Sequence, residues 1–350
     1  MAPRKESSER DKPQVVTLKA LAEHVGLTPG TVSAVLNNSR ASASVPERTK
    51  KRILAAAQEL KYRPNFLARS LRVKRTYTIG VIAQEIGDVY GAMVISGVEQ
   101  YLRERNYFFL TVIHRHDPRL LQTYSQLLVS RSVEGIITVD TSIAHHPSLP
   151  TVAIAGHKRM DRVTNIVLDH RHAALMALQH LVDLGHQRFA FMKGPPSSSD
   201  TNARWEAICE VAGEMGIEMT LQFAPLTEIG ASPEPGYEAT KELLAESRCF
   251  TALFAYNDLC AIGAIRALDE AGLRVPEDVS VVGFDDIPGA SYSRPSLTTV
   301  RQPMQEMGQL AARTLLDQIE KRTSYVPEIA VEPKLIVRQS TWKAPSKLER

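Results

Sequence analysis

The first thirty residues contain a short amphipathic pattern that predicts a helix. Leu18, Leu21 and Val25 recur at helical spacing, and Thr17 supplies a hydroxyl group at the start of the pattern. Gly26 follows it and can adopt the positive φ that ends a helix tightly. We therefore expect a first helix of about two turns.

A second pattern begins directly after this turn. Thr28 can cap a helix whose first position is Pro29, where the missing N–H group costs nothing. Two short helices joined by a glycine-containing turn are typical of a helix-turn-helix, although an ordinary helical hairpin fits the same pattern. The predicted helix, Pro29 to about Asn37, buries Val32, Val35 and Leu36 and turns Thr31, Ser33 and Ala34 outward.

A third helix is predicted from Glu47 to about Leu60, and Ser44 and Glu47 have the spacing of a capping box. Residues 37–44 form a polar connection that we expect to be exposed and mobile. After Pro64 the sequence predicts a helix of about two turns, which is marginal in water unless it folds against a surface. Such a helix is a candidate for folding coupled to binding.

From Tyr77 onward, apolar strands alternate with amphipathic helices. This alternation predicts parallel sheets covered by helices on both faces. The pattern restarts halfway, and a shorter crossing near residues 326–329 completes it, so we expect two non-contiguous lobes with a cleft at their strand ends. The predicted strands are 78–82, 108–113, 133–139, 152–155, 166–168, 189–193, 252–255 and 279–283, and the predicted helices are 92–104, 120–130, 172–184, 203–215, 237–246 and 258–271.

Charge separates the two parts of the chain. Residues 1–75 hold sixteen Lys/Arg and six Asp/Glu, a net charge of +10, whereas the remainder has a net charge of −7. A basic front module suggests contact with a polyanion, although a solvated basic surface is the alternative. The N-terminus lacks the apolar segment of a signal peptide, no apolar stretch is long enough to span a membrane, and the three cysteines fit a reducing compartment, so we expect a cytoplasmic protein.

Specific motifs connect these patterns to a known family. The segments VSAVLN at residues 32–37 and YRPNFLARSLR at residues 62–72 resemble the headpiece and hinge of the lactose-repressor/galactose-repressor (LacI/GalR) family. Residues 180–188, 275–286 and 295–300 resemble the periplasmic-binding-protein-like core of the same family. The resemblance implies an all-α helix-turn-helix headpiece and an α/β two-lobed core (type I) with parallel sheets. It implies a regulator, more often a repressor, that binds a palindromic operator in double-stranded DNA as a homodimer.

The resemblance also implies domain boundaries. We expect a disordered tail at 1–15, the headpiece at 16–62, a hinge helix and linker at 63–75, the effector-binding and dimerisation core at 76–340 and a tail at 341–350. Within the core, the first lobe takes about 76–166 and 301–322, and the second takes about 167–300 and 323–340.

The resemblance implies particular DNA contacts. A leucine of the hinge, here Leu71, wedges into a base step and bends the duplex, although packing against the next domain is an alternative for it. The usual base-reading positions of the second helix fall at Pro29, Gly30 and Ala34, which cannot make bidentate contacts to a base. The implied DNA-binding residues are Thr17, Leu18, Thr28, Pro29, Gly30, Thr31, Ser33, Ala34, Asn37, Asn65, Arg69, Leu71 and Arg72.

For a small-molecule effector such as a sugar or sugar derivative, the resemblance implies the contact residues Tyr90, Arg204, Asn257 and Asp285. A charged and amide set suits hydrogen bonds to hydroxyl groups or a carboxylate. A structural ion pair between Arg204 and Asp285 is the alternative. The family's usual aspartate falls at Ala155, so a regulator without an effector, or one controlled by a protein partner, also stays open.

Other chemistry is weakly indicated. The pairs of histidines at 114/116, 145/146 and 170/172 could bind zinc, but spacing places no third ligand, so we expect no metal site. No phosphate-binding loop or nucleophile motif is present, and we expect neither a cofactor nor catalysis. A solute-binding protein for transport would share the two-lobed core, but it needs export and has no use for residues 17–75.

Overall fold

A computed structural model describes most of the chain. It divides into two compact units, residues 1–76 and residues 77–350, which are treated separately below. The described residues are 16–63, 70, 74–85, 87–141, 148–156, 160–196, 198, 200–217, 223–226, 232–246, 249–322 and 325–346.

The first unit is a small helical domain, as predicted. Its described residues include α1 (Leu18–His24), α2 (Pro29–Leu36), the 3₁₀ helix η1 (Arg40–Ser44) and α3 (Glu47–Glu59). The core of these helices is formed by Leu21, Ala22, Val25, Val32, Val35, Ile53 and Ala56. The tight turn between α1 and α2 depends on Gly26, whose φ of +63° is unfavourable for other residues.

Most of the connection before α3 is exposed, as expected, and its residues 40–44 form η1. Two local expectations for this unit were wrong. Ser33 was expected to face outward, but it is buried, because α2 turns it toward the core. The capping box does not form: the Ser44 hydroxyl donates to the carbonyl of Ala41, and Pro46 occupies the cap position of α3.

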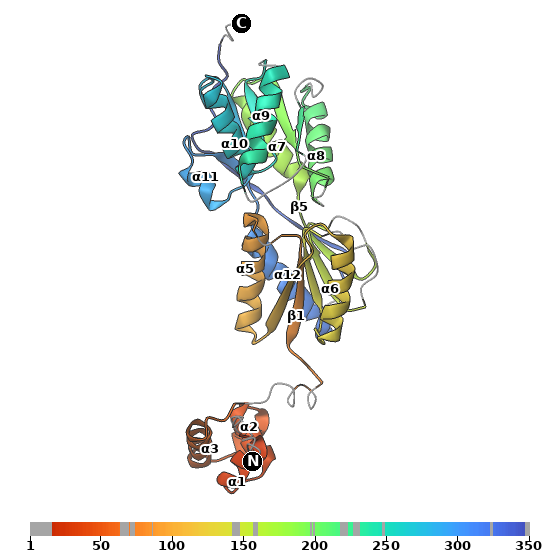
Figure 1. The fold of residues 1–350 in the computed structure, drawn as a ribbon, viewed down its shortest axis with the longest axis vertical. Helices are drawn as coiled ribbons and strands as arrows, with labels where there is room; N and C mark the ends of the chain where they lie inside the picture. Colours follow the sequence, from red (N-terminus) through yellow and green to blue (C-terminus); the bar gives the residue numbers. More distant parts are fainter. Residues whose placement is uncertain are drawn as a thin grey trace, which may run out of the picture. The chain divides into compact units, whose positions relative to one another are not determined.

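The second unit contains two α/β lobes (Figure 1). The first sheet is entirely parallel and has the order β11-β5-β4-β3-β1-β2. Its strands are β1 (Thr78–Ala83), β2 (Phe108–Ile113), β3 (Ile136–Val139), β4 (Thr151–Ile154), β5 (Val163–Leu168) and β11 (Glu328–Val331).

Strand β1 shows why helices cover both faces of this sheet. Ile79 and Val81 pack in the core under α5 (Val89–Glu104) and α12 (Met304–Ile319), whereas Ile82 packs against Leu128 of α6 (Pro118–Ser130). Successive residues of a strand point to opposite faces, so an uninterrupted apolar run requires a cover on each side.

Helices α5 and α12 lie side by side and approach each other closely (Figure 1). A Cβ atom added at Gly97 would lie 2.0 Å from the carbonyl oxygen of Gln305, and one added at Gly308 would lie 2.1 Å from that of Val94. Both glycines are therefore required by the close backbone contact.

The second sheet has the order β12-β10-β9-β8-β6-β7, and only β12 runs antiparallel to its neighbour. Helices α7 and α8 cover one face, while α9 and α10 cover the other. The elements of this lobe are α7 (His170–Asp183), β6 (Phe189–Lys193), α8 (Thr201–Glu214), β7 (Phe223–Pro225), α9 (Glu234–Glu246), β8 (Ala252–Phe254), α10 (Asp258–Glu270), β9 (Ser280–Asp285), α11 (Pro288–Tyr292), β10 (Thr298–Arg301) and β12 (Lys334–Ile336).

The chain passes between the lobes at three points. The first crossing is Asp169, between β5 and α7; the second is residues 302–303, between β10 and α12; the third is residues 332–333, between β11 and β12. The expected lobe boundaries need correction here. Residues 325–331 were assigned to the second lobe and 167–168 likewise, but β11 pairs with β5 in the first sheet, so the boundaries fall after residues 168 and 331.

Candidate functional site

A pocket lies between the two lobes, at the carboxyl ends of strands from both sheets. The polar side chains of such a cleft come from several strand ends because parallel strands all end at the same edge. All four residues expected to contact an effector, Tyr90, Arg204, Asn257 and Asp285, line this pocket. Its other polar residues are Asp88, Asp140, Ser198, Asp200, Tyr256 and Gln302.

Arg204 in α8 is held rigidly at the base of the pocket, where it is 6% exposed. Its Nη1 donates to the carbonyl oxygen of Tyr256 at 2.7 Å, its Nη2 donates to Asp200 at 2.5 Å, and its guanidinium lies 3.8 Å from the ring centroid of Phe284. The Nε–H group has no hydrogen-bond partner among the described residues. One buried donor therefore remains for a ligand.

The ion pair of this arginine differs from the one weighed on the sequence. Arg204 pairs with Asp200, one helical turn earlier, and not with Asp285. Burial opposes the charge of Arg204, but the carboxylates nearby, Asp200 above all, outweigh that effect and raise its pKa above the ordinary value. Asp285 is consequently not committed to a structural ion pair with this arginine.

Asp285 is the last residue of β9 and has an unusual backbone. Its φ is +112° and that of Asp286 is +58°, a strained arrangement of the kind found at functional sites. Its carboxylate accepts a hydrogen bond of 2.6 Å from the side chain of Gln302. Burial raises the pKa of Asp285 to about 7, although Arg204 and Gln302 act in the opposite direction.

Asn257 occupies the N-cap of α10, and its side-chain oxygen accepts a hydrogen bond of 2.8 Å from the backbone N–H of Cys260. This bond fixes the orientation of the amide group. The amide nitrogen is the part of the side chain that can donate to a ligand in the pocket.

Two residues of the first lobe face the second lobe across the pocket. Tyr90 lies in the first turn of α5, and its hydroxyl group is buried without a hydrogen-bond partner among the described residues. Asp140 follows β3 and accepts a hydrogen bond of 3.3 Å from the hydroxyl of Ser198 in the second lobe. The hydroxyl of Ser198 in turn accepts a bond from Tyr256 at 3.1 Å.

The sequence did not predict most of the acidic residues of this pocket. Asp140 follows a buried strand, and this position could have singled it out. Asp88 could be recognised only as the N-cap of α5, since its carboxylate accepts from the N–H of Gly91. With Asp200 and Asp285, four carboxyl groups and one guanidinium line the pocket, so a ligand with several hydrogen-bond donors fits it best.

The pocket is connected to two of the crossings. Nε2 of His170, the residue after the first crossing, lies 2.9 Å from Asp200, whose other oxygen binds Arg204. Gln302, in the second crossing, binds Asp285. A ligand that moved either carboxylate would therefore act directly on the segments that join the lobes.

In the helical domain, the start of α2 forms an exposed surface. Thr28, Pro29 and Gly30 are exposed, Thr31 and Ala34 are half-buried, and Asn37 is exposed beyond the end of the helix. The Thr28 hydroxyl caps the helix by accepting from the N–H of Thr31 at 3.2 Å.

The remaining predicted DNA contacts divide into three groups. Thr17 caps α1, accepting from the N–H of Ala20, and Leu18 packs partly against the core. Ser33 is buried and binds the side chain of Asn37, so it supports the helix from inside. The hinge residues Asn65, Arg69, Leu71 and Arg72 lie outside the described residues.

Among the helices that the structure describes, none combines the length and the apolar character needed to cross a membrane.

Comparison with known families finds two matches. Residues 17–65 match the bacterial regulatory proteins of the lacI family, and residues 178–341 match the periplasmic binding protein-like domain.

Individual proteins match over nearly the full chain. The HTH-type transcriptional repressor PurR of Haemophilus influenzae is 31% identical, over 93% of this chain and 98% of its own length. The lac repressor dimer bound to operator and an anti-inducer has a TM-score of 0.84 at 26% identity, covering 94% of this chain and 100% of that one. The complex of the regulator CelR with cellobiose has a TM-score of 0.67 at 28% identity, covering 93% and 99%.

Proposed function

The chain belongs to the lacI family of bacterial regulatory proteins, and we propose that it represses transcription by binding a palindromic operator as a homodimer under the control of a small molecule. It is a DNA-binding regulator and not an enzyme. Because its target is the chromosome, we place it in the cytoplasm.

The DNA-binding surface that we propose is the exposed start of α2. The helix presents Thr28, Pro29 and Gly30, and exposed basic residues such as Arg40 and Lys51 lie in the same domain. Basic side chains supply phosphate contacts, whereas this helix start offers few groups that read bases. Operator recognition therefore depends on methyl and hydroxyl contacts together with the hinge around Leu71.

The effector, we propose, binds the interlobe pocket and presents several hydroxyl or N–H donors. The observation that carries this assignment is a pair of buried donors, the Tyr90 hydroxyl and the Arg204 Nε–H, that have no hydrogen-bond partner among the described residues and lie in a pocket lined by carboxyl groups. Unpaired buried donors cost about 1–3 kcal/mol each and are expected to find a partner in a bound state. A sugar or another polyol has both the donors and the acceptors required.

A purine base or nucleoside is the second candidate. It is favoured by the similarity to repressors named PurR, and its ring nitrogens could also satisfy both donors. The two candidates differ in shape, since a purine is planar and a sugar is not, and so they can be separated by direct binding.

The mechanism follows from the position of the pocket. A ligand held by Tyr90 and Asp140 of one lobe and by Arg204 and Asp285 of the other favours the lobe arrangement that it bridges best. The lobe arrangement then changes operator affinity, by about 5- to 150-fold for a typical coupling of 1–3 kcal/mol.

The test is a thermal-shift screen of sugars, polyols, purines and nucleosides against the full chain. A ligand at about 100 times its dissociation constant should add about 2.7 kcal/mol to the unfolding free energy. The Tyr90→Phe variant should unfold at the same or a higher temperature without ligand, because it removes an unpaired hydroxyl group, but it should bind the ligand about tenfold more weakly.

Tyr237→Phe is the matched control, because this tyrosine is not among the residues that line the pocket and its hydroxyl donates to Glu270. It should bind the ligand as the wild type does. Equal ligand affinity in the wild type and Tyr90→Phe would exclude the pocket as the ligand-binding site. A ligand that binds without changing operator affinity would contradict the regulatory role.

A further inference from the structure

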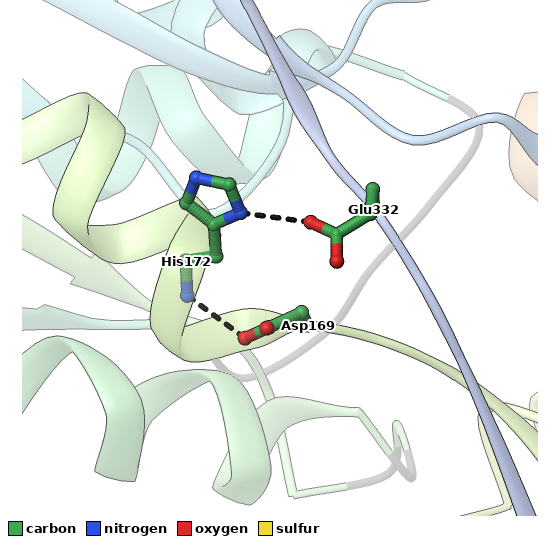
Figure 2. A group of neighbouring side chains, drawn as sticks. All are labelled: Asp169, His172 and Glu332. Carbon is green, nitrogen blue, oxygen red and sulfur yellow. Dashed lines mark hydrogen bonds and ion pairs between the residues drawn. The ribbon is translucent and has the colours of Figure 1, made fainter.

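A group of three metal-ligating side chains lies beside the crossings between the lobes, outside the effector pocket. Figure 2 shows Asp169, His172 and Glu332 as neighbouring side chains. One ligand atom of each residue lies within 4.8 Å of those of the other two. The Nδ1 atom of His172 lies 2.8 Å from Oε2 of Glu332.

The parallel sheet of the first lobe brings these residues together. Strands β5 and β11 are paired in register, with Leu168 opposite Val331, so the next residue of each strand, Asp169 and Glu332, is also placed side by side. The N–H of Asp169 donates to the carbonyl of Val331 at 3.0 Å, which holds the two crossings together. The position of the cluster is thus set by backbone pairing and not by loop conformation.

Helix α7 supplies the third ligand. Asp169 is its N-cap and accepts a bond of 2.9 Å from the backbone N–H of His172 through one carboxylate oxygen, Oδ1. The other oxygen, Oδ2, has no hydrogen-bond partner among the residues that the structure describes, so it can bind an ion. The neighbouring cation, Arg171, is paired with Glu214 and Glu210 on the other side, and it therefore does not neutralise the two carboxylates of the cluster.

We propose that this cluster binds a divalent transition-metal ion of the zinc class and that the ion fastens the first and third crossings together. Imidazole nitrogens and carboxylate oxygens are both zinc ligands, with bonds of roughly 2.0–2.2 Å. The side chains of His172 and Glu332 are 45% and 71% exposed, so they can rotate onto an ion, and water can complete its coordination.

The ion would act on the movement of the lobes. Asp169 and Glu332 belong to two of the three segments that must bend when the lobes rotate, and a shared ion restricts both. The inference does not depend on the identity of the effector or on its pocket, because none of the three ligands lines that pocket.

The experiment is a calorimetric titration of the chelator-treated full chain with zinc sulfate. We expect one site per chain, weakened at least tenfold in His172→Asn, Glu332→Gln and Asp169→Asn. Asp169→Asn keeps the helix cap and weakens the metal ligand, since asparagine caps a helix as well as aspartate does but is a poorer metal ligand. His116→Asn and Glu246→Gln, which change an exposed histidine and an exposed carboxylate elsewhere, should bind zinc as the wild type does.

A second measurement tests the fastening of the crossings. Amide hydrogen exchange at residues 168–173 and 331–334 should slow when zinc is added to the wild type and stay unchanged in His172→Asn. Equal zinc affinity in the wild type and the three cluster variants would overturn the site, and would mean that the cluster is only a helix cap with an exposed ion pair. Zinc binding at the cluster without slower exchange would overturn the fastening.

Discussion

At the scale of single residues, the pocket places a carboxyl group where its charge is unfavourable. Asp285 is buried at the end of β9 and shares the pocket with Asp200 and Asp88, which add to the cost of ionising it. The folded state therefore holds its proton up to about pH 7, whereas the unfolded chain releases it near pH 4.

This shift has a predictable sign. Since the pKa of Asp285 is higher in the folded state, its contribution to stability is complete below about pH 4 and declines as the pH rises toward 7. Without ligand at pH 8, we expect Asp285→Asn to have an unfolding free energy about 2–4 kcal/mol higher than that of the wild type, and therefore a higher unfolding temperature. At pH 4 the two proteins should have nearly the same stability. Calorimetric unfolding at the two pH values measures this.

Asp278 offers the control, because its pKa is lowered by hydrogen bonds from Arg274. Asp278→Asn should leave the protein no more stable at pH 8 than the wild type. If Asp285→Asn had the same effect at pH 4 and pH 8, the raised pKa would not be the cause.

Gly30 illustrates a different residue-scale effect. It lies in the first turn of α2 with an ordinary helical backbone, and a Cβ atom added there would have only the Thr28 hydroxyl nearby, at 3.8 Å. Gly30→Ala should therefore stabilise the helical domain by about 0.5 kcal/mol. If α2 approaches DNA as proposed, the added methyl group should nevertheless weaken operator binding, as measured by fluorescence anisotropy.

The matched control is Gly213→Ala in α8, where an added Cβ atom also meets open space. This variant should gain stability without losing operator affinity. Unchanged affinity in Gly30→Ala would argue against close contact between the start of α2 and the duplex.

At the scale of whole elements, the contact between α5 and α12 is the least tolerant in the first lobe. An added Cβ atom at Gly308 would overlap the backbone of Val94, and neither helix can move without disturbing the sheet below it. We expect Gly308→Ala to lower the unfolding free energy of the core by about 1–3 kcal/mol, as overpacking does, in chemical denaturation followed by circular dichroism. An unchanged denaturation midpoint would mean that the two helices are less closely packed.

The predicted hinge at residues 63–75 is the segment on which the proposed DNA mechanism depends most. Leu71→Ala should reduce both operator affinity and DNA bending, because an apolar wedge keeps a base step open, while non-specific binding through phosphates persists. Bending can be followed by energy transfer between dyes at the ends of a short operator. Leu54→Ala, a change at an exposed leucine of α3, should bend DNA like the wild type, and equal bending by all three proteins would rule out the wedge.

At the scale of the whole molecule, the sequence predicted most of the architecture but only part of the site. Periodicity identified most strands and helices of both lobes, because buried parallel strands are continuous apolar runs. It did not predict helix α12, strand β10 or the short elements β7, α11 and β12. The expected lobe boundaries placed β11 in the wrong lobe, since a short strand carries no information about which sheet it joins. Asp140 and Asp200 were not predicted as site residues for a related reason. They reach the pocket only because the two lobes fold against each other, and the local sequence pattern does not predict contacts between lobes.

The histidine motif at residues 170–172 also shows that sequence spacing does not predict contacts between residues far apart in the chain. Spacing alone gave it no third ligand, but Glu332 is brought beside His172 by strand pairing from 160 residues away. His170, two residues earlier, faces the effector pocket through Asp200 instead. Neighbouring residues of one helix start thus serve two separate sites.

The late position of β11 and β12 also has a consequence for the order of events during synthesis on the ribosome. The helical domain is complete after some sixty residues and can fold as soon as it emerges, whereas the first lobe lacks α12 and an edge strand until residue 331 has been translated. A nascent or prematurely terminated chain therefore carries an assembled DNA-reading module attached to an unfinished sensor.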